Sequence, residues 1–231
     1  MNTPRQIGTV YVTGGASGLG AAVATAVQQA GGVAGIIDHQ VPEVDAPFAK
    51  ADLADSAAAA AAVEDLVAQI GPPDAVVTAA GTDRCGALTD VPVEEWERVV
   101  RVNLFGTVAV VRACLPHLTE RRGTVVTVGS TLGLRPAGDA TAYCASKFGI
   151  TGFTRALAME LAGTVGVTLL VPGGMRTHFF DGRDAQYQPG PDAQLNDPAD
   201  VAHAVLTALR QPVGCEIREL VVAQSTEPSW P

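Results

Sequence analysis

Lysine is almost absent from this chain of 231 residues, because only Lys50 and Lys147 occur among its 15 basic side chains. Basic charge is also scarce overall: 24 acidic side chains leave a formal net charge of -9. An acidic protein has no general attraction to phosphate backbones or to anionic lipid headgroups. We therefore expect neither a nucleic-acid-binding protein nor a membrane-surface protein.

Cysteine and long apolar runs are scarce as well. The four cysteines, at positions 85, 114, 144 and 215, have neither metal-ligand spacing nor the density of a disulfide framework. No apolar run reaches the roughly 18 residues of a membrane span, and the N-terminus lacks the charged head and apolar body of a leader. We expect a cytoplasmic protein with no metal site and no membrane segment.

What is present points to a folded domain. Hydrophobic residues make up 47% of the chain and charged residues 17%, the reverse of the balance in disordered proteins. At roughly 150 residues per domain the length allows one large domain or two small ones. Because no linker or repeat divides the sequence, we predict a single domain over residues 1–231.

Short runs rich in β-branched residues alternate with longer Ala-rich stretches. The predicted strands are Thr9–Thr13, Val33–Ile37, Ala75–Thr78, Thr124–Val128, Val167–Val171 and Leu220–Val222, and the predicted helices are Ala21–Ala30, Ala57–Ile70, Glu94–Leu118, Ala142–Leu161 and Ala199–Leu209. Continuous Val and Ile runs are typical of strands buried on both faces. The alternation predicts an α/β fold with a doubly wound parallel β-sheet flanked by helices on both faces.

A glycine-rich segment, Thr13-Gly14-Gly15-Ala16-Ser17-Gly18-Leu19-Gly20, lies between the first predicted strand and helix. Glycines let the backbone approach a pyrophosphate closely, and the helix N-terminus offers free N–H groups. Asp38 ends the second strand, where a carboxylate can accept hydrogen bonds from ribose hydroxyls. Taken alone, the glycines could form a structural turn and Asp38 could begin another.

A second signal is the pair Tyr143 and Lys147, four residues apart on one predicted helix. Tyrosine has a pKa of about 10 and becomes a base near neutral pH only where a cation stabilises its phenolate. The pair is therefore either a packed surface contact or an acid–base device. One of only two lysines in the chain stands at this position, which favours the second interpretation.

Together these motifs resemble the short-chain dehydrogenase/reductase family over essentially the whole chain, which implies a Rossmann-type fold. The resemblance implies catalytic roles for Asn103, Ser130, Tyr143 and Lys147. It implies cofactor contacts from Gly14, Ser17, Gly18, Leu19, Gly20, Asp38, Asp52, Leu53, Ala80, Gly81, Asn103, Tyr143, Lys147, Pro172, Gly173 and Thr177. The segment Pro172-Gly173-Gly174-Met175-Arg176-Thr177 is similar to the part of the family that contacts the nicotinamide end.

Two features depart from the family pattern. Thr78-Ala79-Ala80-Gly81 stands where the family has an asparagine-containing segment, so a side chain that ties strands together is lost. From this first departure we expect some loss of local rigidity and no loss of cofactor binding. The second departure is the predicted substrate lid, residues 178–197, which is short, so we expect a comparatively open substrate mouth.

Several single residues admit a plain structural interpretation. Ser130 could be a strand-end turn residue and Asn103 a helix residue with local hydrogen bonds. Cys144 is assigned to core packing, and Phe179, Phe180 and Tyr187 are as compatible with packing inside the lid as with a substrate wall. The four histidines, His39, His117, His178 and His203, are interpreted as solvated or capping residues; of these, His178 is the one close enough to the lid to meet substrate.

The resemblance implies an NAD(H)-dependent oxidoreductase that interconverts a secondary alcohol and a ketone, with Tyr143 as acid/base and NADP as the less favoured cofactor. Asn103 would position a water for proton relay to Lys147. The alternative is a catalytically idle dinucleotide-binding sensor or scaffold. The family also implies a homotetramer, or else a dimer, formed through Glu94–Leu118 and Ala142–Leu161, with a small-molecule substrate that the sequence does not identify.

Overall fold

The computed structural model describes residues 4–227, and these residues contain one parallel sheet of seven strands in the order β3-β2-β1-β4-β5-β6-β7. The strands are β1 (Thr9–Thr13), β2 (Val33–Asp38), β3 (Phe48–Lys50), β4 (Ala75–Thr78), β5 (Thr124–Val128), β6 (Gly166–Pro172) and β7 (Glu219–Val222). Every residue of β4 and β5 is buried, as expected for central strands covered on both faces. The predicted doubly wound α/β fold is confirmed.

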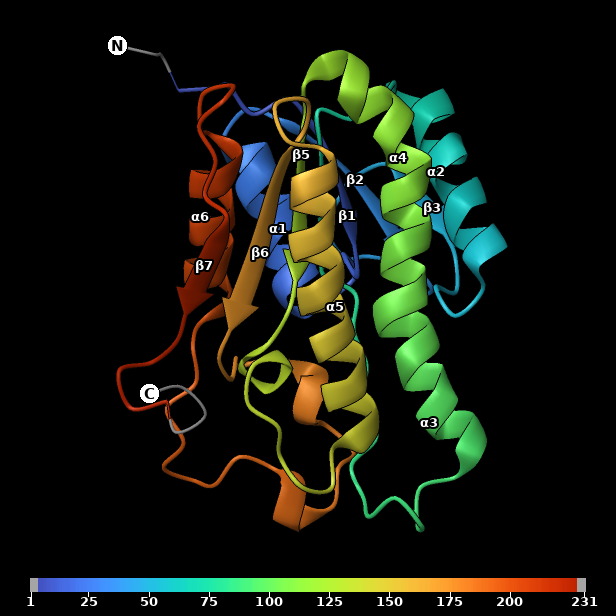
Figure 1. Cartoon of the computed structure of the whole chain (residues 1–231), viewed down its shortest axis with the longest axis vertical. Coiled ribbons are helices and arrows are strands. Elements are labelled where there is room, and N and C mark those ends of the chain that lie inside the picture. Colours follow the sequence, from blue (N-terminus) through green and yellow to red (C-terminus); the bar gives the residue numbers. More distant parts are fainter. Residues whose placement is uncertain (1–3, 228–231) are drawn as a thin grey trace.

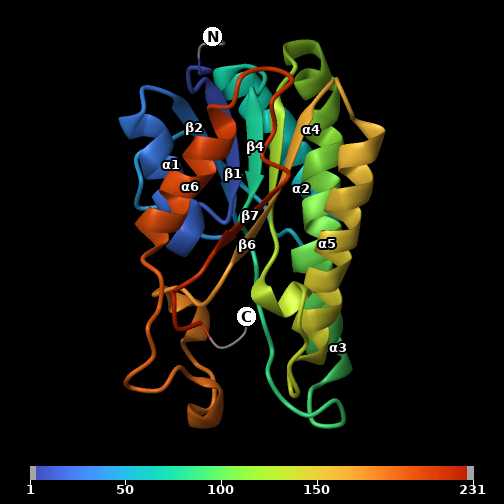
Figure 2. The same ribbon diagram turned by 60° about the vertical axis from the view of Figure 1, so that its left-hand side comes forward.

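Helices cover both faces of the sheet (Figures 1 and 2). The helices are α1 (Gly18–Gln29), α2 (Ser56–Ile70), α3 (Val93–Val100), α4 (Thr107–Arg121), α5 (Thr141–Glu160) and α6 (Pro198–Leu209), and the short helical segments are η1 (Arg101–Gly106), η2 (Thr131–Gly133), η3 (His178–Phe180) and η4 (Ala185–Tyr187). Figure 2 shows α1 and α6 on one face and α2, α4 and α5 on the other. Each layer encloses its own hydrophobic cluster against the sheet.

Side-chain caps fix where two of these helices begin. The carboxylate of Asp55 accepts hydrogen bonds from the backbone N–H groups of Ala57 and Ala58 at the start of α2. Asp197 accepts from Ala199 N in the same way, and Pro198 at the first position of α6 has no N–H to leave unpaired. Such caps stabilise a helix by about 1 kcal/mol each.

Two elements differ from the sequence prediction. The short edge strand β3 was not predicted, because only three residues form it within a segment rich in Pro and Asp. The predicted helix Glu94–Leu118 extends over Val93–Arg121 and contains the π-helical segment η1 at its centre. A π-helix differs from an α-helix in its backbone hydrogen bonds, which join residues five apart rather than four. The pattern of apolar side chains does not reveal this difference, so the π-helical segment was not predicted.

The same helix, Val93–Arg121, is long and apolar enough to cross a membrane by length and composition alone, since an 18-residue window within it has a mean hydropathy of 1.5. Polar residues such as Asn103 and Arg112 interrupt its apolar run, so it contains no uninterrupted apolar stretch of membrane-spanning length. Four of its side chains belong to the core cluster under α2: Val110, Val111, Cys114 and Leu118. In this fold it packs as a helix of one layer.

The parallel arrangement brings the carboxyl ends of all strands to one edge, the lower edge in Figure 1. The connections after β1, β2, β4, β5 and β6 therefore meet there. The chain order reverses between β1 and β4, which is the place where doubly wound sheets bind ligands. Nearly every predicted site residue lies at this edge.

Candidate active site

The glycine-rich turn after β1 is shaped so that side chains would not fit. Gly14 and Gly18 have φ angles of +71° and +53°, which favour glycine. A Cβ placed on Gly14 would lie 2.7 Å from Ala80 Cα, and one placed on Gly20 would collide with the carbonyl oxygen of Gly14. The turn is therefore a backbone cradle packed against the loop after β4, as a dinucleotide pyrophosphate requires.

The N-terminus of α1 opens into this cradle without a side-chain cap. Ser17 is the N-cap residue, its hydroxyl makes no capping hydrogen bond, and the first turn of α1 holds no acidic residue. Leu19 is buried and anchors the helix in the core. Free N–H groups and the positive end of the helix dipole suit an anion, so these residues fit the predicted dinucleotide.

Asp38 already has protein partners. Its two oxygens accept hydrogen bonds from Ala16 N and Gln40 N, each at 3.0 Å. His39 Nδ1 lies 3.1 Å from Oδ1, and the Asp38 residue is only 7% exposed. Asp38 thus ties the end of β2 to the glycine-rich turn. Because each carboxylate oxygen can accept two hydrogen bonds, capacity for ribose hydroxyls remains.

Asp52 is paired with Arg98, a contact that the sequence did not suggest. The guanidinium donates from Nη1 and Nη2 to the two carboxylate oxygens at 3.0 and 3.2 Å. This hydrogen bonding, followed by that from Ala54 N, lowers the pKa of Asp52 below its ordinary value. Leu53 is buried beside Gly106, at the end of η1. The Asp52 carboxylate is exposed at the rim of the cleft and is held by this pair.

Tyr143, Ser130 and Lys147 come together where β5 ends and α5 begins. The Ser130 hydroxyl lies close enough to the Tyr143 phenol to lower its pKa, and it accepts a hydrogen bond from Leu132 N at 3.1 Å. Lys147 Nζ lies 5.6 Å from the centroid of the Tyr143 ring and donates to the carbonyl oxygen of Val128 at 2.8 Å. The Lys147 residue is 4% exposed, so its ammonium is inside the protein.

Burial dominates the protonation of this pair. It raises the pKa of Tyr143 to about 12, against the lowering effect of the Ser130 hydroxyl, and it lowers the pKa of Lys147 to about 8. Two charged residues outside the predicted set also act on Tyr143: Asp83 raises its pKa and Arg183 lowers it. In the protein alone, both members of the pair are therefore shifted toward their neutral forms.

Asn103 lies in η1, and both N–H groups of its side-chain amide and one lone pair of its oxygen are engaged. Nδ2 donates to Thr82 O at 2.9 Å and to Ser146 Oγ at 3.0 Å, and Oδ1 accepts from Thr82 N at 2.8 Å. The amide thus fastens α5 and the loop after β4 to the long helix. The predicted water for proton relay would have only the second lone pair of Oδ1 or the backbone to bind.

The departure at Thr78 has a structural counterpart. Its hydroxyl oxygen is buried and has no hydrogen-bond partner among the described residues. The neighbouring connection is made instead by Thr13, whose Oγ1 accepts from Ala80 N at 3.1 Å. Gly81 remains open toward the site, since a Cβ added there would lie 3.8 Å from Lys147 Nζ.

The segment after β6 lies over the cradle. Gly173 N donates to Val222 O at 2.9 Å, which keeps Pro172 and Gly173 buried beside β7. A Cβ on Gly18 would lie 3.3 Å from the Thr177 methyl group, so Thr177 covers the glycine-rich turn. An open hollow of about 460 Å³ lies under residues 176–195, beside this cover and apart from Tyr143.

The lid contacts the proposed acid–base group directly. The Phe179 and Tyr143 ring centroids are 5.5 Å apart, and Arg183 stacks over Phe179 and Phe180 at 4.7 and 4.8 Å. Tyr187 donates to Asp139 Oδ2 at 3.1 Å. The lid aromatics therefore pack within the lid and against the site, and the expected open mouth is covered at Tyr143.

The histidines and Cys144, which were interpreted as structural residues, lie in different surroundings. His39 and His178 are exposed and each lies beside a carboxylate, that of Asp38 and that of Asp181. Cys144 is buried, with Sγ 3.9 Å from Ala137 O. Among the described residues no group of three or more His, Cys, Asp or Glu side chains could hold a metal ion.

The fold, the glycine cradle and the Tyr143–Lys147 pair define an oxidoreductase of Rossmann type. Residues 8–188 match the family model for short chain dehydrogenase. The chain belongs to the short-chain dehydrogenase/reductase family, as its motifs predicted.

Relatives across this family differ widely in length and activity. The chain is 30% identical to glycine betaine reductase ATRR of Emericella nidulans over 94% of its own length, but it spans only 19% of that protein. It is 32% identical to the (2S)-[(R)-hydroxy(phenyl)methyl]succinyl-CoA dehydrogenase subunit BbsD of Thauera aromatica, covering 84% of this chain and 86% of that one. A short chain dehydrogenase from Burkholderia cenocepacia, solved in complex with NADP, is 27% identical with a TM-score of 0.82, covering 95% and 98% of the two chains.

Proposed function

We propose that this protein is an NAD(H)-dependent oxidoreductase that interconverts a secondary alcohol and a ketone. The observation that supports this most directly is the meeting of Tyr143, Ser130 and Lys147 beside a glycine cradle at the switch point of the sheet. A relative named as a dehydrogenase of a hydroxy compound is consistent with the reaction. Turnover of a panel of secondary alcohols and ketones with NAD(H) and NADP(H) tests it.

Each group of the site has a role in this reaction. A bound nicotinamide would take up the hydride from the alcohol or supply it to the ketone. In the oxidative direction Tyr143 accepts the proton of the alcohol hydroxyl, and in the reverse direction it returns a proton to the ketone oxygen. Ser130 donates a hydrogen bond to the reacting oxygen, and Lys147 holds the nicotinamide ribose.

Tyr143 can act as a base near neutral pH only if nearby positive charge lowers its pKa. Moving a tyrosine pKa from about 10 to about 7 requires roughly 4 kcal/mol, and the buried value of about 12 increases this requirement. With a pKa of about 8, Lys147 is still mainly an ammonium at neutral pH, so it can stabilise the phenolate. We infer that the phenolate forms when the cationic, oxidised cofactor adds its charge to that of Lys147.

The preference for NAD over NADP is proposed from Asp38. Its carboxylate would face a 2'-phosphate, and the turn from Thr13 to Gly20 contains no Arg or Lys to compensate. The NADP bound to the Burkholderia cenocepacia relative is a reason to measure both cofactors. The idle sensor or scaffold is distinguished by the same assay, since it would bind dinucleotide and turn over nothing.

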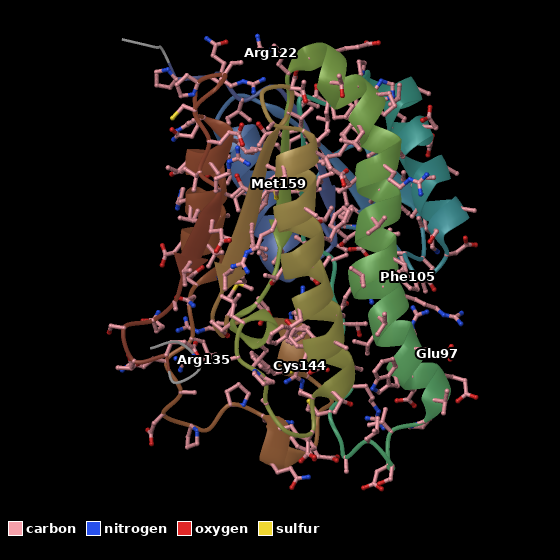
Figure 3. All side chains as sticks on the ribbon, in the orientation of Figure 1. Glu97, Phe105, Arg122, Arg135, Cys144 and Met159 are labelled. Atoms are coloured by element: carbon pink, nitrogen blue, oxygen red, sulfur yellow. The ribbon has the colours of Figure 1, made fainter. Side chains whose placement is uncertain are left out.

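We further propose a cytoplasmic homo-oligomer, a tetramer or else a dimer, built on the long helix Val93–Arg121 and on α5. Phe105 and Met159 are 53% and 80% exposed, and Figure 3 shows both on the face formed by these helices. Gly152 leaves open space above it, as a close helix contact requires. Gly149 on the same helix packs on Leu104 of its own chain, because a Cβ there would lie 2.8 Å from Leu104 Cδ2. The C-terminal segment Leu220 to Trp230 could pack at a subunit contact or on its own subunit, and it lies partly outside the described residues.

A further inference from the structure

A buried ion pair links the lid to the loop after β4. Arg183 Nη2 lies 3.0 Å from Asp83 Oδ2, and the two side chains are 15% and 4% exposed. The exposed fractions of the other Arg–carboxylate pairs are much larger, for example 50% and 48% for Arg98 and Asp52. Placing two charges in the protein interior is unfavourable unless their hydrogen-bonding groups find partners.

Of the two side chains, only Asp83 has further hydrogen-bond partners. Asp83 accepts from Arg84 N at 2.7 Å and from Cys85 Sγ at 3.3 Å. Arg183 Nη2, in contrast, is buried and makes no hydrogen bond to any described residue, although Asp83 Oδ2 lies 3.0 Å away as its ion-pair partner. A buried N–H group without a hydrogen bond is unfavourable, so a further acceptor placed beside Arg183 would be stabilising.

The unfilled donor belongs to the substrate side of the site. Arg183 stacks on Phe179, and Phe179 in turn packs on the ring of Tyr143. The charge of Arg183 also lowers the pKa of Tyr143, so the two side chains are in electrostatic contact. An acceptor for Arg183 would therefore be part of a molecule whose other end reaches the phenol.

We propose that Arg183 binds a carboxylate carried by the substrate, so that the enzyme acts on hydroxy acids and the corresponding keto acids. This rests on the proposed function and names its substrate class. The planar guanidinium can pair with Asp83 on one edge and accept a second carboxylate on another. Asp83 limits the charge that the pocket can take, so a singly charged carboxylate fits better than a dianionic phosphate, and a cationic substrate is disfavoured.

The test uses matched substrates. The wild-type enzyme is assayed with a series of secondary hydroxy acids of increasing chain length and with the methyl ester of each. We expect kcat/KM for the best acid to exceed that of its ester by roughly 10-fold or more, since hydrogen bonds to charged groups are the strong ones. An enzyme that prefers the esters throughout would overturn the proposal.

Substitutions at Arg183 distinguish carboxylate binding from a purely structural role. Arg183→Met keeps the apolar stem that packs on Phe179 and should lower kcat/KM for the acid by roughly 10- to 100-fold, with the ester changed much less. Arg183→Lys should recover part of the loss. Arg135→Met, which changes an exposed arginine at the same end of the molecule (Figure 3), should leave kcat/KM for both substrates unchanged. Equal losses for acid and ester in Arg183→Met would make the pair a purely structural latch.

Asp83→Asn supplies a second, opposite signal. Removing the competing negative charge should tighten binding of the acid, whereas loss of a structural latch would lower activity with both substrates.

If no alcohol or ketone is turned over, the proposed function fails. The carboxylate site is still tested by adding the hydroxy acids to NADH-loaded protein and following NADH fluorescence. A response to acids that Arg183→Met abolishes supports the site, and no response to any acid overturns it.

Discussion

The ring of Phe179 lies 5.5 Å from the ring of Tyr143, tilted by 55°. The first aromatic of the lid thus covers the proposed acid–base group and contributes to the burial that raises its pKa to about 12. Removal of the Phe179 ring should therefore change the titration of the phenol.

Phe179→Ala should expose Tyr143 to water and lower its pKa from about 12 toward the ordinary value of about 10. Ultraviolet absorbance of the phenolate measures this in the cofactor-free protein, with Tyr143→Phe identifying the signal of that residue. Phe180→Ala is the matched control, because its ring contacts Phe179 rather than Tyr143. An unchanged titration in Phe179→Ala would show that the lid does not determine this pKa.

Tyr143→Phe should lower turnover by roughly 10² to 10⁴ while NADH still binds, because the proposed proton acceptor is lost and the ring is kept. Lys147→Ala should impair both binding and turnover, and Lys147→Arg should also be poor, since a planar fork does not replace a compact ammonium. Steady-state kinetics and NADH fluorescence titration measure the two effects. Near-normal activity of Tyr143→Phe would remove Tyr143 from the acid–base role.

The buried ammonium of Lys147 predicts a pH dependence of stability. Its pKa is about 8 in the folded protein and about 10.4 in an unfolded chain, so between these values the unfolded state binds more protons. Folding stability from this group should therefore rise with pH across that window. Tyr143 acts in the opposite sense above about pH 10, where its raised pKa makes the unfolded state release protons first.

Urea unfolding of wild type and Lys147→Met at pH 7 and pH 9.5 measures this dependence. Methionine removes the buried charge and keeps most of the stem, so the rise between the two pH values should be smaller in the variant. Lys50→Met is the matched control for loss of a lysine, because Lys50 is exposed. A rise of the same size in all three proteins would contradict the assignment to Lys147.

Asp38→Asn should shift cofactor preference toward NADP by roughly 10-fold or more, because like charges placed together cost several kcal/mol. The ratio of kcat/KM for the two cofactors is the measurement. Glu43→Gln, an exposed change in the following loop, serves as the control. A wild-type preference for NADP would contradict the role given to Asp38.

Met159→Glu should weaken subunit association if α5 forms the interface, since it places a charge on an exposed apolar face. Light scattering of wild type at micromolar concentration should give a multiple of 23.6 kDa, and the variant should give smaller particles. Val213→Glu, which changes an exposed apolar residue in the loop between α6 and β7, should leave the mass unchanged. A wild-type monomer would defeat the proposed assembly.

Local patterns predicted much of this architecture. The strand sequences, the glycine turn and the four-residue spacing of Tyr143 and Lys147 all depend on neighbours in the chain, and the structure places them as expected. Contacts between distant segments left no such pattern. Arg98 on α3 meets Asp52, and Arg183 in the lid meets Asp83, only because segments distant in the sequence come together at one edge of the sheet. Exposed charges elsewhere in the sequence look the same.

The π-helical segment η1 has a consequence for insertions and deletions. Ahead of it, α3 is fastened to α5 by the hydrogen bond from Trp96 Nε1 to Thr141 Oγ1, at 3.0 Å; behind it, α4 is fixed by its buried side chains. One residue removed between them would restore an ordinary helix and keep α3 in nearly the same orientation relative to α4, because the wider π turn takes up about one extra residue. A single-residue deletion within 101–106 should therefore preserve the packing of α3 better than the same deletion inside α4, which would turn the part of the helix ahead of it by about 100°.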